Sequence, residues 1–354
     1  LPRRSKIIMD RKDEHVSLAK GFHKIKENSF DHVRVIHDSL PQSAYHQTSI
    51  ATELFGQQLT SPFFINAMTG GSEKTAGINQ KLAILARETK LMLATGSISA
   101  ALRDPSVAHS HQIVREVFPE GILLANIGEG STLEDAKRGV DLFNANALQI
   151  HLNAPQELVM PEGDRDFTQW LRLIEEITAN LDVPVIVKEV GFGMSRQTMQ
   201  RLLDVGVKTI DVAGSGGTSF TQIENARRRK REFSYLSDFG ITTVASLLEA
   251  NEIPMNFELI ASGGIRHTYD IFKALCLGAN AVGISASILN HLLVNELEDT
   301  IVLVQQWQQE LISLYTLVGA KTTADLKQVP LLLSGENKTW CEARGIDFTK
   351  YSQR

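Results

Sequence analysis

The chain has 354 residues, of which 43% are hydrophobic and 22% are charged, as in an ordinary globular protein. Its formal net charge of −5 excludes a global basic field of the kind that attracts nucleic acid. No apolar run approaches the roughly 18 residues of a membrane-spanning helix. We therefore expect neither a nucleic-acid partner nor a membrane partner.

The N-terminal stretch LPRRSKIIMDRKDEH is basic but lacks the apolar core of a secretory signal. The two cysteines, Cys276 and Cys341, lie outside any CxxC pair, which indicates reduced thiols. Together these features predict a cytoplasmic protein.

Short apolar runs alternate with helical segments from residue 63 to residue 284. The runs lie at 63–67, 91–95, 121–126, 147–151, 183–188, 207–212, 257–262 and 280–284. Most are continuously apolar, as expected of parallel strands that are buried on both faces. The segments between them have helical spacing and end near Gly or Asn.

Strands that alternate with helices in this number predict an α/β fold, the (β/α)8 TIM barrel. We expect a single domain over 1–354, with barrel strands at about 63–284. Residues 1–62 would form an N-terminal segment over the barrel mouth, and 288–354 a C-terminal helical segment. The alternative is a doubly wound open sheet, which the absence of GxGxxG after the first strand disfavours.

Nearly all of the predicted strands end in small, glycine-rich or polar residues. Examples are N-A-M-T-G-G from residue 66, H-L-N from residue 151 and S-G-G-I-R from residue 262. The carboxyl ends of all the strands of such a barrel meet at one face, where active sites lie. The sequence therefore predicts one functional site at that face.

The fourth strand leads into IHLNAPQELVMPEG, which places His151, Asn153, Gln156 and Glu157 close together. One carboxylate beside amides suits Mg²⁺, which takes one or two carboxylates, waters and phosphate oxygens, better than it suits Zn²⁺. Taken singly, His151 could be a core histidine, and Asn153 and Gln156 could be turn residues. Their joint placement at a strand end favours a functional role.

The last two strands end in turns that favour an anion. Gly263 and Gly264 let backbone N–H groups approach a ligand, and Ser287 could start a helix whose N-terminus faces it. The loops after strands seven and eight are the usual phosphate site of a barrel. The alternative is that the glycines only allow tight chain reversal.

Lys188 ends the fifth strand and could pair with a phosphate, form a Schiff base or stabilise an anionic ring. The alternative interpretation is that Lys188 is an ordinary surface lysine without a functional role. With Thr69, Ser97 and Asn126 on other strand ends, it could surround a planar polar ligand. Such a ring of groups suits FMN, whose single phosphate matches the last two loops.

Two basic segments remain ambiguous. The run at 227–231 could form a lid or meet phosphates, or it could be a solvated loop. Arg11, Lys12 and His15 lie within five residues, for which a solvated helix start is the default interpretation. If the N-terminal segment folds over the barrel mouth, Arg11 and Lys12 could clamp a diphosphate.

Taken together, these motifs resemble the type 2, FMN-dependent isopentenyl diphosphate isomerases. The resemblance rests on R-K-x-x-H at 11–15, M-T-G-G at 68–71, T-G-S at 95–97, H-x-N-x-x-Q-E at 151–157, K-E-V-G-F-G within 185–193, G-G-T at 216–218, S-G-G-I-R at 262–266 and A-S at 286–287. The H-x-N-x-x-Q-E motif combined with R-K-x-x-H is specific, whereas G-G-I-R occurs in many FMN barrels.

The resemblance implies an isomerase of isoprenoid biosynthesis that interconverts isopentenyl diphosphate and dimethylallyl diphosphate. It implies reduced FMN, with NADPH as reductant, and Mg²⁺ as cofactors. One proton is added to the allylic unit and another removed, and the reduced flavin is expected to serve as acid and base. Family members assemble as tetramers or larger, so a homo-tetramer or homo-octamer is expected.

The resemblance also implies roles for individual residues. The substrate would be bound by Arg11, Lys12, His15 and Gln156. The catalytic set would be His151, Asn153, Gln156 and Lys188. The metal ligand would be Glu157. FMN would be bound by Ala67, Met68, Thr69, Gly70, Ser97, Asn126, Lys188, Thr218, Gly263, Gly264, Arg266, Ala286 and Ser287.

The sequence departs from the family pattern at one position. Some members have an arginine three residues after the serine of T-G-S, where this chain has Ala100 and the nearest arginine is Arg103. We leave Arg103 outside the predicted site.

Two other functions stay open as alternatives. One is a redox FMN enzyme, such as a 2-hydroxy-acid oxidase or an enzyme like IMP dehydrogenase. The first needs a His–Arg pair near the flavin, and the second needs a catalytic cysteine in a strand-end loop, where neither Cys276 nor Cys341 lies. The other alternative is a barrel that binds nucleic acid through 227–231, against which the acidic net charge argues.

Overall fold

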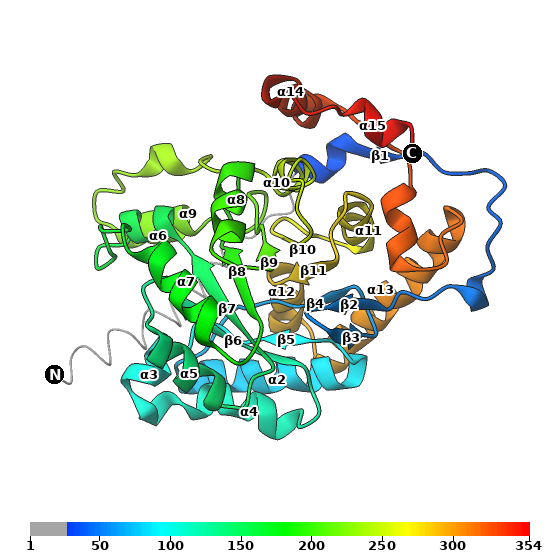
Figure 1. Cartoon of the computed structure of the whole chain (residues 1–354). Coiled ribbons are helices and arrows are strands. Elements are labelled where there is room, and N and C mark those ends of the chain that lie inside the picture. The colour runs from blue at the N-terminus through cyan, green and yellow to red at the C-terminus, as the bar shows by residue number, and fades with distance from the viewer. Residues whose placement is uncertain (1–26) are drawn as a thin grey trace.

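A computed structural model, which describes residues 27–354, confirms the predicted closed barrel (Figure 1). Its parallel strands follow one another around the barrel in the order β10-β11-β4-β5-β6-β7-β8-β9, and β9 closes it by pairing with β10. The strands are β4(Phe63–Ile65), β5(Leu93–Ala94), β6(Leu123–Gly128), β7(Ala147–Leu152), β8(Val185–Glu189), β9(Thr209–Asp211), β10(Glu258–Ser262) and β11(Ala281–Ile284). The open-sheet alternative is therefore wrong.

Helices surround the barrel, and most connect one strand to the next (Figure 1). They are α2(Glu73–Thr89), α3(Ser99–Arg103), α4(His109–Val117), α5(Leu133–Asp141), α6(Ala154–Val159), α7(Trp170–Asn180), α8(Arg196–Asp204), α9(Phe220–Arg227), α10(Thr243–Ala250), α11(Thr268–Cys276), α12(Ala286–Val294), α13(Leu297–Leu317), α14(Gly335–Arg344) and α15(Thr349–Ser352). No helix among the described residues is both long enough and apolar enough to cross a bilayer.

The barrel interior changes character along the strands. Its deeper half is apolar and includes Phe64, Leu124 and Ile186. Since side chains alternate between the two faces of a strand, residues two positions further on face the same interior. Those positions hold Asn66, Asn126 and Lys188, all buried. The interior therefore becomes polar towards the carboxyl ends of the strands.

Two segments outside the barrel pair with each other although they are far apart in the sequence. Strand β1(Val33–Val35) pairs antiparallel with β12(Leu331–Leu333), so the N-terminal and C-terminal segments form one small sheet. A second antiparallel pair joins β2(Thr52–Leu54) to β3(Gln57–Leu59). The C-terminal segment is thus mostly helical but contributes one strand.

The first described residues approach the carboxyl end of the barrel. Asn28 caps the 3₁₀ helix η1(Ser29–His32), and its side-chain amide donates a 2.8 Å hydrogen bond to the carbonyl of Gly264 after β10. The prediction that all of 1–62 covers the barrel mouth is wrong for the β2–β3 hairpin, because Thr52 donates to the carbonyl of Asn280 before β11 and the backbone N–H of Phe55 donates to Glu258 at the start of β10, both at the amino ends of the strands. For residues 1–26, which lie outside the described part of the chain, the cover stays a prediction.

Candidate active site at the carboxyl ends of the barrel strands

The barrel brings most of the predicted site residues to one end, because all of its strands run in the same direction. Each predicted residue from Ala67 onward lies at the carboxyl end of a barrel strand, in the loop that follows it or in the first helix after it. In strand order these residues are Ala67, Met68, Thr69, Gly70, Ser97, Asn126, His151, Asn153, Gln156, Glu157, Lys188, Thr218, Gly263, Gly264, Arg266, Ala286 and Ser287. Arg11, Lys12 and His15 lie outside the described residues.

Lys188 lies inside the barrel and not on the surface. It is 7% exposed, is the register partner of His151 on β7 and of Asp211 on β9, and donates a 2.6 Å hydrogen bond to the carbonyl of Glu189. Burial lowers the pKa of Lys188, an effect that the negative charges of Asp211 and Glu189 oppose. Burial likewise raises the pKa of Asp211. The surface-lysine alternative is therefore wrong.

His151 is held by an amide on the neighbouring strand. Its Nδ1 lies 2.7 Å from Oδ1 of Asn126, and the amide of Asn126 donates to Oε1 of Gln149 at 3.2 Å. Gln149 in turn donates to Asn66 at 3.0 Å, and Asn66 donates to Asp211 at 2.8 Å. His151 is thus part of a polar row and not an isolated core histidine.

Gln156 reaches a carboxylate that the sequence did not single out. Its Nε2 donates to Oε1 of Glu224 on α9 at 3.1 Å, and Glu224 is fully buried. The other oxygen of Glu224 accepts a 2.5 Å hydrogen bond from Arg227. An amide and a buried ion pair therefore lie beside the loop after β7.

Glu157 has the surroundings of a candidate metal ligand. One carboxylate oxygen accepts from Asn153 at 3.0 Å, and the other accepts from the backbone N–H of Asp164 at 2.8 Å. After β6, Glu129 has a buried Oε2 without a hydrogen-bond partner among the described residues. Burial, with the negative charges of Glu157 and Asp164, raises the pKa of Glu129 to about 8.

This arrangement fits Mg²⁺ only as part of a larger ligand set. Within residues 27–354, no group of three or more His, Cys, Asp or Glu side chains is arranged to hold a metal ion. Mg²⁺ keeps several waters and takes phosphate oxygens from a substrate, so one or two carboxylates suffice for it. Oxygen donors near Glu157 therefore suit Mg²⁺ with a bound phosphate better than a structural metal.

The loops after β9 and β10 are packed so closely that they need glycine. A Cβ on Gly263, at φ +88°, would lie 2.1 Å from the carbonyl oxygen of Gly214. A Cβ on Gly217 would lie 2.8 Å from the backbone nitrogen of Gly264. Since these positions carry no side chains, a phosphate in these loops would meet backbone groups, as in a phosphate cradle.

Two hydroxyl groups complete the fit to a flavin phosphate and ring. The hydroxyl of Thr69 is buried and has no hydrogen-bond partner among the described residues, as expected of a group that serves a ligand. Ser287, in the first turn of α12, donates to the carbonyl of Ile265 at 2.6 Å and so joins the loops after β10 and β11. These groups fit FMN.

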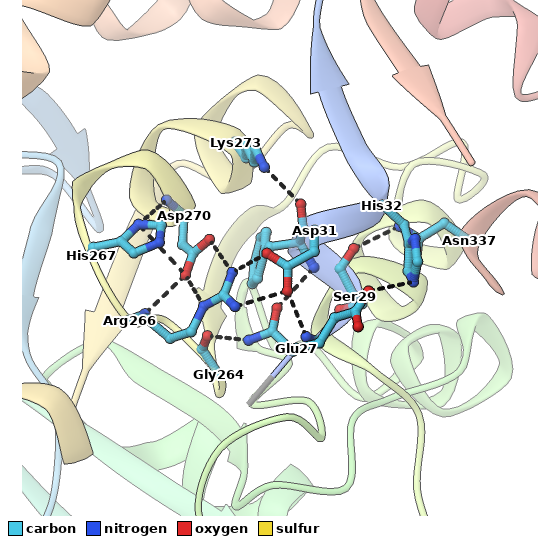
Figure 2. Close-up of polar contacts among 12 residues, drawn as sticks. Glu27, Ser29, Asp31, His32, Gly264, Arg266, His267, Asp270, Lys273 and Asn337 are labelled. Atoms are coloured by element: carbon cyan, nitrogen blue, oxygen red, sulfur yellow. Dashed lines mark hydrogen bonds and ion pairs between the residues drawn. The ribbon is translucent and has the colours of Figure 1, made fainter. Parts of the chain in front are cut away.

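Arg266 was predicted to hold the FMN phosphate, but its described partners are carboxylates (Figure 2). Its guanidinium donates to both oxygens of Asp31, at 2.8 and 2.6 Å, and to both oxygens of Asp270, at 2.8 and 3.0 Å. These bonds raise the pKa of Arg266 and lower that of Asp31 to about 2. Arg266 therefore ties η1 to the loop after β10, and its contact with phosphate stays a prediction.

The basic run at 227–231 is only partly a solvated loop. Arg227, whose side chain is 12% exposed, pairs with Glu224 at 2.5 Å and with Glu162 at 2.9 Å. Arg228 pairs with Glu232 and lies over the ring of Phe233. Residues 229–231 are exposed. The first two arginines thus hold loops together, while the rest of the run faces solvent.

Other predicted features fall outside this site. Arg103 is exposed at the end of α3. Cys276 and Cys341 are buried and unpaired, as expected of reduced thiols. One surface pocket lies beside Arg196 on α8 and another beside Tyr269 on α11, so neither belongs to the strand-end site.

Sequence reasoning assigned no role to four buried polar groups near the site, namely Asn66, Gln149, Asp211 and Glu224. Asn66 begins a strand end that was noted only for its composition, and the other three were not singled out. The alternation of side chains along a strand could have identified Gln149, because it lies two residues before His151 and therefore faces the same barrel interior.

Comparisons with known proteins agree with this geometry. A family model described as FMN-dependent dehydrogenase matches residues 133–332. The isopentenyl-diphosphate delta-isomerase of Latilactobacillus sakei subsp. sakei (strain 23K) is 49% identical over 337 residues, which cover 95% of this chain and 96% of the relative. The enzyme of the same name from Streptomyces sp. (strain CL190) is 46% identical over 346 residues, covering 97% and 95%.

Solved structures support the fold at lower identity. A mandelate oxidase with (S)-2-phenylpropionate matches with a TM-score of 0.62 at 16% identity, over 91% of this chain and 90% of that one. A flavocytochrome b2 mutant with pyruvate bound matches with a TM-score of 0.66 at 18% identity, over 88% and 78%. These two likenesses concern the barrel alone.

Proposed function

This chain belongs to the FMN-dependent isopentenyl-diphosphate delta-isomerases, and we propose that the carboxyl end of its barrel binds the substrate diphosphate beside the flavin. The enzyme interconverts isopentenyl diphosphate and dimethylallyl diphosphate. The observation that carries the site proposal is the common location of four residues. His151 and Lys188 are register partners, and Gln156 and Glu157 follow directly in α6.

FMN is proposed to lie across the strand ends, with its phosphate in the loops after β10 and β11. Gly263, Gly264 and Ser287 would hold the phosphate through backbone groups and the N-terminus of α12. The hydroxyl of Thr69 and the ammonium of Lys188 would hydrogen-bond the polar edge of the ring. Reduced FMN would supply the acid–base group for the proton transfers.

The remaining FMN contacts are proposed on position alone. The residues concerned are Ala67, Met68, Gly70, Ser97, Asn126, Thr218, Arg266 and Ala286. All lie at strand ends, in the loops that follow or, for Ala286, at the start of α12, which supports the proposal.

The loop after β7 is proposed to hold the diphosphate and its metal. Diphosphate carries roughly three negative charges near neutral pH, and burying it without compensation would cost many kcal/mol. Mg²⁺ at Glu157 would supply part of the opposite charge. His151, Asn153 and Gln156 would orient the substrate, and Gln156 is itself oriented by Glu224.

Several further expectations belong to the same proposal. Arg11, Lys12 and His15 would complete the diphosphate site from the N-terminal segment. NADPH would reduce the flavin, a homo-tetramer or homo-octamer would form, and the enzyme would work in the cytoplasm.

The test is an absorption spectrum of the purified protein followed by an isomerase assay. We expect a flavin spectrum, with isomerase activity only after reduction of the flavin and addition of Mg²⁺. A colourless protein that gains no isomerase activity with FMN, NADPH and Mg²⁺ would refute the proposal. Flavin reduction on mixing with a 2-hydroxy acid, with stoichiometric turnover, would favour the redox alternative instead.

A further inference from the structure

Four hydrogen bonds connect five polar side chains across the barrel interior, from His151 on β7 to Asp211 on β9. The row is His151–Asn126–Gln149–Asn66–Asp211, with distances of 2.7, 3.2, 3.0 and 2.8 Å. Gln149 and Asp211 are fully buried, and Asn66 and Asn126 are 1% and 3% exposed. Water therefore has almost no access to these bonds, and each group must find its partner within the protein.

The direction of the row is fixed at Asn66 by the backbone. The backbone N–H of Ala67 donates to Oδ1 of Asn66 at 2.9 Å. A backbone N–H can only donate, so the atom that it meets must be the oxygen of the amide. The amide nitrogen of Asn66 consequently faces Asp211, whose other carboxylate oxygen accepts from Ser262 at 2.6 Å.

The orientation of every other amide follows from this one. Because Gln149 meets the oxygen of Asn66, the contacting group of Gln149 must be its NH₂. The oxygen of Gln149 then faces Asn126, which must donate through its own NH₂. The oxygen of Asn126 is left facing Nδ1 of His151 at 2.7 Å, so that nitrogen must carry a proton. The orientations of the three amides are the same whether Asp211 is charged or neutral.

The fold makes room for this arrangement on β11. A Cβ on Gly283 would lie 2.3 Å from Nδ2 of Asn66, so any larger residue would displace the amide that sets the direction. No positive φ is involved at Gly283, so the need for glycine there is a need for space. Gly283 therefore leaves space for the amide of Asn66 in the orientation that its hydrogen bonds require.

We propose that Asn66 and Gln149 are positioning residues that hold His151, through Asn126, with a proton on Nδ1. Any proton that the ring gains or loses is then exchanged at Nε2. The neutral ring has a lone pair at Nε2, and only the imidazolium has an N–H there.

This inference deepens the proposed function and rests on it for its consequence. If Nε2 meets the diphosphate, a hydrogen bond to that anion requires a proton on Nε2 as well. His151 would then bind substrate as the imidazolium, adding one positive charge at the site. A ring free to move its proton could instead donate from Nε2 while neutral.

The test is nitrogen-15 NMR of the FMN-bound protein, labelled at histidine, without substrate. Long-range nitrogen–proton correlations distinguish a protonated ring nitrogen from a bare one, and a His151→Gln sample assigns the signals. We expect Nδ1 of His151 to be protonated at every pH at which the protein is folded. A bare Nδ1 in the wild-type protein at any such pH overturns the inference.

A matched pair of variants tests the row itself. Gln149→Met keeps most of the side-chain volume but removes the amide, so Asn126 can present either end to His151, and a fraction of bare Nδ1 is expected. Ser262→Ala removes a hydrogen bond to Asp211 without touching the direction set by Ala67, and should leave Nδ1 protonated. Unchanged Nδ1 protonation in Gln149→Met, or loss of it in Ser262→Ala, would contradict the proposal.

The wild-type spectrum keeps the inference falsifiable even if Gln149→Met does not fold. It also separates the two proposals, because it needs neither substrate nor turnover. A protonated Nδ1 in a protein without isomerase activity would refute the proposed function alone. A bare Nδ1 in an active isomerase would refute the positioning role alone.

Discussion

The ion pair between Asp31 and Arg266 predicts that the N-terminal segment contributes to the stability of the barrel. Asp31→Asn removes the negative charge from a fork in which two guanidinium nitrogens of Arg266 meet both oxygens of Asp31, at 2.6 and 2.8 Å (Figure 2). It also weakens the cap of η1, since Asp31 accepts the backbone N–H of Asn28 at 2.8 Å. We expect the free energy of unfolding to fall.

The size of the effect follows from the pKa of Asp31. The hydrogen bond from Arg266, opposed by partial burial, lowers that pKa from 3.8 to about 2. Such a difference corresponds to about 2.4 kcal/mol. Because the side chain of Asp31 is 33% exposed, solvent screening reduces the expected loss to about 1 kcal/mol.

The pH dependence has a definite sign. The pKa of Asp31 is depressed in the folded protein, so its stabilisation is complete above about 4 and is lost as the pH falls towards about 2. Asp31→Asn should therefore be less stable than the wild type at pH 7, and the difference should shrink below pH 4.

The assay is urea unfolding of the FMN-bound protein, with Asp38→Asn as the matched control. Asp38 is exposed, and its side chain accepts one local hydrogen bond from the backbone N–H of Leu40. Both variants change the net charge equally. If Asp31→Asn unfolds at the same urea concentration as Asp38→Asn at pH 7, the reasoning is refuted.

Four other changes test the site and its supports. Glu157→Gln should raise the Mg²⁺ concentration for half-maximal activity about tenfold while FMN stays bound, and an unchanged Mg²⁺ response would remove Glu157 from the metal site. Lys188→Ala should lower FMN affinity or alter the flavin spectrum; if both are unchanged, Lys188 does not meet the ring. Gly263→Ala, at φ +88°, should weaken FMN binding by at least tenfold in a fluorescence titration, whereas Gly130→Ala, with open space around its Cβ, should not. Glu249→Gln should lower the free energy of unfolding by about 2 kcal/mol, because its buried carboxylate accepts hydrogen bonds from Arg344 and pairs with Arg196, whose side chains are 33% and 31% exposed. Glu342→Gln, in an exposed pair, is the control.

The barrel strands were predictable because each is buried on both faces and so reads as an apolar run. The pairing of β1 with β12 was not predictable, because it joins Val33 to Leu333 and neither short strand has a distinctive pattern. Local patterns identify elements, whereas the partner of an isolated strand is decided by tertiary packing.

The strand-end site was predictable for a related reason. In a parallel barrel all the carboxyl ends meet, so polar residues after each apolar run had to come together. What the sequence did not reveal is how those residues are already engaged. Arg266 forms ion pairs with Asp31 and Asp270, and Gln156 donates a hydrogen bond to Glu224. The contacts with Asp31 and Glu224 join segments that are far apart in the chain.

The row of polar side chains from His151 to Asp211 affects both the stability of the barrel and the orientation of His151. Gln149 is fully buried and contacts the amides of Asn66 and Asn126, so its own amide must be desolvated before it gains these bonds. A methionine would avoid that cost for its own side chain but would leave the buried NH₂ of Asn126 without its acceptor, so the amide at this position also satisfies its neighbours. An amide differs from methionine in having a donor at one side and an acceptor at the other. That asymmetry is what transmits the direction set at Ala67 to the ring of His151.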